Sequence, residues 1–263
     1  MDLGIKGKIA FVGGSSSGLG EAVAKSLALE GVNVILSARD QKGLDRVSSE
    51  IRNESDVEVF TVQADFSKPA DLERVVRETL MRFGHVDILF NNTGGPPSCR
   101  FEETTADMWT QSYRMLLMSV VTLTQGFLHG MKERKWGRII CSTSIAVKQP
   151  VENLILSNSV RASVTGFART LANEVATSGI TVNCVLPGYT MTQRLDYLAK
   201  KATEIDNISY KEAIEKWTGE IPMKRIGDPK EFADVVTFLA SERASYVTGQ
   251  SLAIDGGWVR SLL

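Results

Sequence analysis

Short apolar runs alternate along the chain with longer segments in which apolar residues recur every three or four positions. The short runs are rich in Val, Ile and Leu, and they predict seven strands at residues 8–13, 33–37, 57–62, 86–90, 138–142, 181–186 and 251–254. The longer segments predict helices at residues 19–30, 41–54, 69–83, 105–134, 153–177 and 229–241. Because this alternation is typical of βαβ units, we predict an α/β fold with a doubly wound, seven-stranded parallel sheet. We expect residues 1–263 to form a single domain.

Residues 191–224 are polar and helix-prone, and they carry no strong strand signal. In a parallel sheet, ligands bind at the carboxyl ends of the strands. We therefore expect this segment to form a lid or a substrate-binding insertion there. Its large apolar residues suit either the underside of a lid or ordinary packing; they are Met191, Leu195, Trp217 and Met223.

A glycine-rich turn, Gly14-Ser15-Ser16-Ser17-Gly18-Leu19-Gly20, joins the first predicted strand to the first predicted helix. In a Rossmann fold such a turn lets the backbone approach a pyrophosphate, and the helix N-terminus offers unpaired N–H groups. The turn predicts a dinucleotide site, with a tight turn that binds nothing as the alternative. The second predicted strand is followed by Arg39 and Asp40. Arg39 favours a 2′-phosphate, and so NADP(H) over NAD(H), whereas Asp40 suits an adenosine ribose or a helix cap.

Further motifs follow the later strands: Asp65, Asn91-Asn92-Thr93-Gly94, Pro187-Gly188, and the closing segments Val247-Thr248-Gly249-Gln250 and Asp255-Gly256-Gly257. Together with the glycine turn, they resemble the motifs of the single-domain short-chain dehydrogenases/reductases over roughly residues 6–258. The pattern is most similar to that of the 3-oxoacyl-carrier-protein reductases and related carbonyl reductases. The resemblance implies a Rossmann fold, a nicotinamide cofactor and a small-molecule carbonyl or alcohol substrate. It also implies a homotetramer or homodimer packed through the helices predicted at 105–134 and 153–177.

The resemblance also assigns cofactor contacts. Asp65 would contact the adenine, the segment from Asn91 would support the nicotinamide side, and residues 187–192 would pack on the nicotinamide and its phosphates. The predicted cofactor-binding residues are Gly14, Ser16, Ser17, Gly18, Leu19, Gly20, Arg39, Asp65, Phe66, Asn91, Thr93, Gly94, Arg161, Pro187, Gly188, Thr190 and Thr192.

The active-site positions depart from the family's set of Asn, Ser, Tyr and Lys. The serine position is Ser144, but the tyrosine position holds Ser157 and the lysine position holds Arg161. The asparagine position falls on Leu116. We predict Ser144, Ser157 and Arg161 as the catalytic residues of an altered site, which could polarise a carbonyl without a tyrosine.

Proton delivery is the open question in such a site. A phenol has a pKa of ~10 that a nearby cation can lower, whereas a serine hydroxyl cannot easily follow. Arg161 keeps the lysine's charge and could hold ribose hydroxyls, but it keeps its proton too firmly to relay it. Tyr113 and Tyr189 are alternative donors, with a packing role as the competing interpretation. Arg114 and Lys148 are either charge partners or plain surface charges.

We therefore predict an NADP(H)-dependent oxidoreductase that interconverts a carbonyl and an alcohol, similar to the 3-oxoacyl reductases but with an atypical Ser/Ser/Arg site. The alternative is a nucleotide-binding or regulatory protein of the same fold in which catalysis is impaired, because three of the four catalytic positions differ. The identity of the substrate and the direction of the reaction stay open, since residues 191–224 carry no recognisable motif.

Charge and composition exclude other classes. The 30 Lys and Arg residues are balanced by 31 Asp and Glu residues, and no basic run suggests nucleic-acid binding. No run reaches the ~18 apolar residues of a membrane helix. The N-terminus does not resemble a secretory signal, so we expect a cytoplasmic protein. Cys99, Cys141 and Cys184 are predicted as core residues, and the sequence shows no metal-site spacing.

Overall fold

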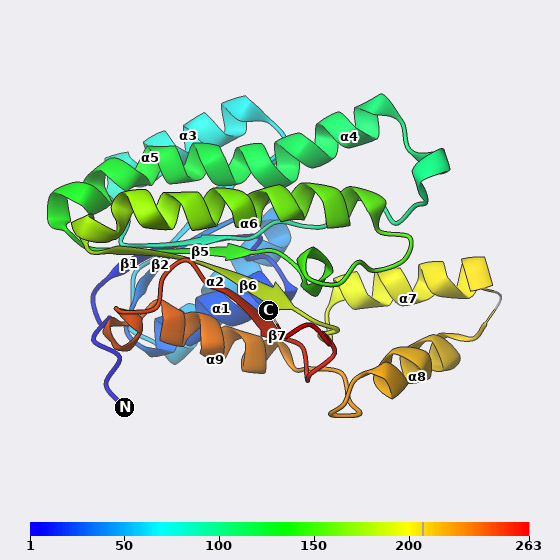
Figure 1. Ribbon diagram of the computed structural model, residues 1–263. Helices are drawn as coiled ribbons and strands as arrows, with labels where there is room; N and C mark the ends of the chain where they lie inside the picture. The colour runs from blue at the N-terminus through cyan, green and yellow to red at the C-terminus, as the bar shows by residue number, and fades with distance from the viewer. Residues whose placement is uncertain (207, 263) are drawn as a thin grey trace.

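A seven-stranded sheet forms the centre of the protein in the computed structural model, which describes residues 1–206 and 208–262 (Figure 1). The strands are β1 (Ile9–Gly13), β2 (Asn33–Ala38), β3 (Val59–Gln63), β4 (Ile88–Asn91), β5 (Gly137–Ser142), β6 (Ile180–Pro187) and β7 (Ser251–Ile254). Their order is β3-β2-β1-β4-β5-β6-β7, and every neighbouring pair is parallel. The chain thus winds outward from β1 in one direction and from β4 in the other, which confirms the predicted doubly wound sheet.

Helices cover both faces of this sheet (Figure 1). One face carries α1 (Gly18–Leu29), α2 (Gln41–Glu54) and α9 (Pro229–Leu239), and the other carries α3 (Pro69–Phe83), α5 (Ser119–Arg134) and α6 (Ile155–Val175). Three further helices lie toward the carboxyl ends of the strands: α4 (Ala106–Tyr113), α7 (Gln193–Asp206) and α8 (Tyr210–Glu220).

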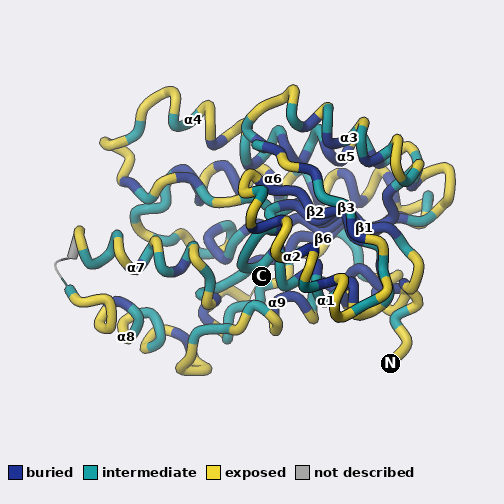
Figure 2. The backbone as a smooth tube through the Cα atoms, turned by 180° about the vertical axis from the view of Figure 1, so that it is seen from behind, coloured by how far each residue is buried: buried dark blue, intermediate teal, exposed yellow. Residues whose placement is uncertain are grey.

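Two apolar cores lie on opposite faces of the sheet because successive strand residues point to opposite sides. Phe11 of β1 packs with the rings of Phe66 and Phe127 on the α5 side. The next residue, Val12, belongs to the core under α1 and α9. Figure 2 shows the central strands largely buried, whereas α4, α7 and α8 expose much of their surface. The edge strands β3 and β7 are partly exposed. The continuous apolar runs of the sequence therefore reflect strands that are covered on both faces.

Helix ends follow the local signals. α3 begins at Pro69, whose fixed φ suits the first turn, and it ends before Gly84, which has the left-handed φ of 74°. Both α2 and α3 have the predicted boundaries.

The helix predicted over 105–134 is divided. α4 passes into a π-helical turn at Arg114–Met118 before α5 begins. The hydroxyls of Ser112 and Ser119, on either side of this turn, donate to the carbonyls of Met108 and Met115 one turn earlier. Such bonds compete with the helix backbone and bend it. The single continuous helix of the prediction was therefore wrong at this point.

Cys99, Cys141 and Cys184 are buried and unpaired, which confirms their prediction as core residues. Within residues 1–206 and 208–262, no helix is long and apolar enough to cross a membrane. The same residues contain no group of three or more His, Cys, Asp or Glu side chains that could hold a metal ion.

Candidate active site

A cleft of about 1150 Å³ opens at the carboxyl ends of the strands. Its walls come from the turns that follow β1 to β6, and α6, α7 and α8 complete them. Because parallel strands end at the same edge of a sheet, segments far apart in the sequence meet in this cleft. The volume exceeds the range of ~300–1,000 Å³ for one drug-sized ligand, so the cleft has room for a dinucleotide beside a small molecule.

The turn after β1 depends on two glycines. Gly14 has a left-handed φ of 62°, a conformation that other residues rarely adopt. Gly20 lies beneath it in α1, where a Cβ would lie 2.2 Å from the Gly14 carbonyl oxygen. Only glycine at residue 20 therefore lets the helix approach the turn this closely.

The N-terminus of α1 faces the cleft through Ser17, Gly18 and Leu19, all of which line it. Ser17 is the N-cap residue, but its side chain makes no capping hydrogen bond. The first-turn N–H groups that this side chain leaves uncapped, together with the positive end of the helix dipole, form a site suited to an anion.

Arg39 and Asp65 line the cleft after β2 and β3. Asp65 accepts hydrogen bonds from the backbone N–H of Ser67, at 3.0 Å, and from its hydroxyl, at 2.7 Å. Burial opposes the ionisation of Asp65, but these bonds and the charges of Arg39 and Lys68 outweigh it, so its pKa is lowered. Asp40 also lines the cleft; it is the N-cap residue of α2, but its side chain makes no capping hydrogen bond.

The three predicted catalytic residues line the same cleft at its other end. Ser144 Oγ accepts the backbone N–H of Ala146 at 3.1 Å, which leaves the hydroxyl proton free. Ser157 lies in the first turn of α6 and is only 6% exposed. Within the described part of the chain its hydroxyl has no hydrogen-bond partner. Arg161 follows one helical turn later, on the same face of α6.

The Arg161 guanidinium is held by backbone carbonyls. Nη1 donates to Ser142 O at 3.0 Å and Nη2 donates to Gly94 O at 3.3 Å, so the group joins the ends of β5 and β4. Burial, followed by the positive charge of Arg194, lowers the pKa of Arg161 to about 10. Arg161 is therefore still a cation at neutral pH.

Two predicted cofactor residues, Gly20 and Asn91, do not line the cleft, so a direct contact stays a prediction for both. Gly20 supports the turn from below. Asn91 is the last residue of β4, and its side chain points into the core, where Nδ2 lies 3.4 Å from Thr124 Oγ1. The next residue, Asn92, lines the cleft instead and donates to Gly13 O at 3.1 Å. The other predicted cofactor residues all line the cleft.

Comparison with known proteins identifies the family. Residues 14–259 match the family model described as enoyl-(acyl carrier protein) reductase. The chain is 32% identical to the uncharacterized oxidoreductase YvaG of Bacillus subtilis, over 100% of both chains. It is also 32% identical to the 3-oxoacyl-acyl-carrier-protein reductase FabG of Vibrio cholerae, over 97% of this chain and 98% of that one. The L-sorbose reductase of Gluconobacter frateurii, solved with NADPH and L-sorbose, superimposes with a TM-score of 0.94 at 35% identity, covering 100% of each chain. The chain is a short-chain dehydrogenase/reductase.

Tyr189 lines the cleft, and no other tyrosine of the described residues does. Its ring stacks on Trp217, with centroids 4.9 Å apart, and meets Trp258 edge to face at 5.9 Å. Burial, followed by the charges of Glu220 and Glu152, raises the pKa of Tyr189. Its phenol is therefore a weaker acid than in water, and its position is that of a wall residue.

The other residues that the sequence suggested for catalysis, or for the asparagine position, lie outside the lining of the cleft. Tyr113, Arg114 and Lys148 are exposed and do not line the cleft. Leu116 is buried inside the π-helical turn.

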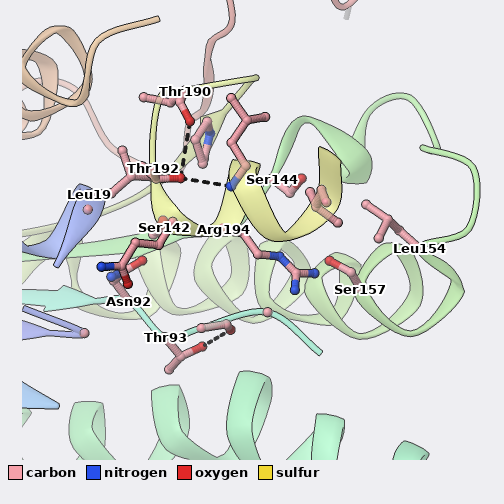
Figure 3. A pocket seen from close by; sticks show the side chains of 18 of the residues that line it. Leu19, Asn92, Thr93, Ser142, Ser144, Leu154, Ser157, Thr190, Thr192 and Arg194 are labelled. Carbon is pink, nitrogen blue, oxygen red and sulfur yellow. Dashed lines mark hydrogen bonds between the residues drawn. The ribbon is translucent and has the colours of Figure 1, made fainter. Parts of the chain in front are cut away.

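Arg194 is a cleft residue that the sequence reasoning missed. It lies in the first turn of α7, and Figure 3 shows its side chain extending from that helix toward Ser157 on α6. Nη2 donates to Pro96 O at 2.8 Å, and a Cβ on Gly95 would lie 2.8 Å from Arg194 Cζ. The available signal was an arginine two residues after Thr192, just beyond the segment 187–192 assigned to the nicotinamide and inside the predicted lid segment 191–224.

Residues 191–224 form α7, α8 and the segments next to them, in the described part of the chain. Leu195 and Trp217 line the cleft, whereas Met191 and Met223 are exposed and lie outside its lining. Two of the four large apolar residues that the sequence suggested for the underside of a lid therefore contribute to the wall of the cleft.

Proposed function

We propose that the chain is an NADP(H)-dependent oxidoreductase that interconverts a carbonyl and an alcohol. The observation that carries the proposal is one cleft shared by the glycine turn before α1 and by Ser144, Ser157 and Arg161. Hydride transfer needs the reacting atoms ~3–3.5 Å apart, so cofactor and substrate must share one space. The likeness to an L-sorbose reductase solved with NADPH supports the same reading.

The residues present fit this cofactor. The uncapped N-terminus of α1 suits a diphosphate, and Gly14 lets backbone and ligand approach closely. Arg39 is exposed at the rim of the cleft, where a guanidinium can bind a 2′-phosphate by two hydrogen bonds. When bound, the nicotinamide supplies or accepts the hydride.

The protein's own residues polarise the carbonyl. Ser144 has a free hydroxyl proton, and Ser157 has an unpartnered hydroxyl in the described structure, so both can donate to a carbonyl oxygen. Arg161 supplies a fixed positive charge that stabilises the negative charge developing on that oxygen. Because serine and arginine both keep their protons at neutral pH, water supplies the proton that completes the alcohol.

The test is NADPH consumption by the purified protein with a panel of 3-oxoacyl thioesters, ketoses such as L-sorbose, and simple ketones. We expect turnover with at least one class, and a fall of roughly 10²-fold in Ser144→Ala, the cost of losing one donor to a developing oxyanion. Ser163→Ala is the matched control, because Ser163 is an exposed serine of α6 outside the cleft lining. Turnover that survives in Ser144→Ala would contradict the assigned role.

A second function is favoured by the replacements Ser157 and Arg161 themselves: a protein that binds the nucleotide without turning over substrate. Saturable NADPH binding with no turnover on the whole panel would support it.

We also propose a homodimer or homotetramer, as the family resemblance implies. Sedimentation of the purified protein as a monomer would contradict that assembly.

A further inference from the structure

Two arginines meet at the catalytic end of the cleft. Arg161 reaches it from α6, and Arg194 reaches it from α7. They approach closely enough for the charge of Arg194 to lower the pKa of Arg161. Burial likewise lowers the pKa of Arg194, and a guanidinium keeps its proton in proteins at neutral pH. The catalytic end therefore carries two neighbouring positive charges.

No carboxylate of the described residues neutralises this pair. Neither guanidinium has an Asp or Glu oxygen within 4.0 Å in residues 1–206 and 208–262. Two acidic residues line the cleft near Tyr189. Glu220 accepts the Trp258 indole N–H at 3.0 Å, and the charge of Glu152 acts on Tyr189 but is not among the charges that act on either arginine. Asp65, which also lines the cleft, is occupied by Ser67 in the turn after β3. Arg161 is buried and Arg194 is half-buried. Two neighbouring cations that are withdrawn from water without a counter-ion are costly, and an anion between the two groups would relieve this cost.

Both guanidinium groups are fixed in place and still have unused donors. Of the five N–H donors of an arginine, Arg161 uses two on Ser142 O and Gly94 O, and Arg194 uses one on Pro96 O. The bonded carbonyls orient each fork before a ligand arrives, which lowers the entropy lost on binding. A carboxylate, with two oxygens in one plane, matches such forks.

We propose that Arg194, together with Arg161, binds a carboxylate on the substrate, so that the substrate is an oxo acid or the corresponding hydroxy acid. The inference rests on the proposed function, because it assumes that the carbonyl is reduced at Ser144 and Ser157. The cofactor's diphosphate has its own site at the N-terminus of α1. Tyr189 and Trp217, stacked beside this end, form an apolar wall for the remainder of the molecule.

Binding is measured first, without hydride transfer. Protein saturated with NADP⁺ is titrated by calorimetry with 2-oxo and 3-oxo carboxylates, acetoacetate among them, and with their methyl esters. We expect wild-type protein to prefer at least one acid over its ester, and Arg194→Gln to lose roughly 10- to 100-fold in affinity for that acid, as for hydrogen bonds to charged groups. Arg194→Lys, which keeps the charge but lacks the planar fork, should fall between the two.

Lys201→Gln is the matched control. It removes the same charge from α7, but Lys201 pairs with Glu204, with 41% of its side chain exposed, and lies outside the cleft lining. The preference for the acid should survive in this variant. Circular dichroism and NADPH affinity show whether each variant is folded with an intact cofactor site.

Three results overturn the inference. In the first, no acid binds better than its ester; in the second, Arg194→Gln still prefers the acid to the ester. In the third, Arg194→Gln lowers the affinity for NADPH instead, which makes the cofactor the counter-ion of the arginine pair. Turnover of neutral ketones with any of these results defeats the inference and leaves the proposed function standing. Preference for an acid that depends on Arg194, with no hydride transfer on any substrate, supports the inference about binding and defeats the proposed function.

Discussion

Replacing Gly20 with alanine tests how the fold builds the nucleotide turn. The new Cβ would lie 2.2 Å from Gly14 O, 2.6 Å from Gly14 C and 2.8 Å from Gly13 O. All three are backbone atoms of the turn, so no side chain can rotate away to make room. Overpacking of this kind costs about 1–3 kcal/mol, and the better helix propensity of alanine returns about 0.5–1 kcal/mol. These ranges leave a net loss of up to about 2.5 kcal/mol in the free energy of unfolding.

The matched control is Gly166→Ala. Gly166 is also a helical glycine, in α6, but a Cβ there would meet nothing within 4 Å. Alanine should therefore stabilise the protein by about 0.5–1 kcal/mol. The two variants make the same chemical change, so the opposite signs isolate the contact with the turn.

Urea unfolding at 25 °C with linear extrapolation measures both variants, and NADPH titration measures the site. Gly20→Ala should weaken NADPH by about tenfold or more, because the displaced Gly14 carbonyl moves the N–H groups that face the cleft. Gly166→Ala should leave NADPH affinity unchanged. Equal stabilities, or a gain in Gly20→Ala, would show that the close contact between Gly20 and the Gly14 backbone does not limit residue 20 to glycine.

Three further predictions concern residues that line the cleft. Turnover should stay level from about pH 6 to 9 and fall as the pH rises toward 10, because the Arg161 cation is lost above its pKa of about 10. Arg194→Gln removes a like charge and should move this alkaline fall in turnover to higher pH. A fall in turnover near pH 7 would point to another group. Arg39→Ala should lower the ratio of NADPH to NADH affinity by about tenfold or more, and an unchanged ratio in paired titrations would remove Arg39 from 2′-phosphate binding. Tyr189→Phe should keep kcat within about threefold, because its pKa is raised and its ring still stacks on Trp217; a loss of ~10²-fold or more would identify Tyr189 as the general acid.

The sequence was sufficient for the sheet because the five inner strands are almost wholly buried and appear in the sequence as apolar runs. Pro69 and Gly84 likewise mark the ends of α3 by local backbone preference. The π-helical turn at Arg114–Met118 has no such mark, since the segment contains neither glycine nor proline. The hydroxyls of Ser112 and Ser119 form hydrogen bonds with backbone carbonyls at this turn. The spacing of apolar residues along the sequence does not reveal such bonds.

The motifs at strand ends were good guides to the cleft, because the topology of a parallel sheet brings those ends together. They do not distinguish neighbouring residues: Asn91 still belongs to β4 and points into the core, while Asn92 has left the strand and lines the cleft. Arg194 could not be found this way. Its position depends on Gly95 and Pro96, almost a hundred residues earlier, and on a helix that has no motif.

The arginine pair links ligand choice to stability. Each buried cation costs several kcal/mol of lost hydration, and a second cation nearby adds repulsion, which is why the pKa of Arg161 falls. A carboxylate that binds only the folded protein stabilises it by about 2.7 kcal/mol at a hundred times its Kd. The unfolding midpoint of wild-type protein should therefore rise with an oxo acid and not with its methyl ester, and Arg194→Gln should remove the difference. Since the midpoint needs no hydride transfer, it detects the charge pair in an active reductase and in a nucleotide-binding protein alike.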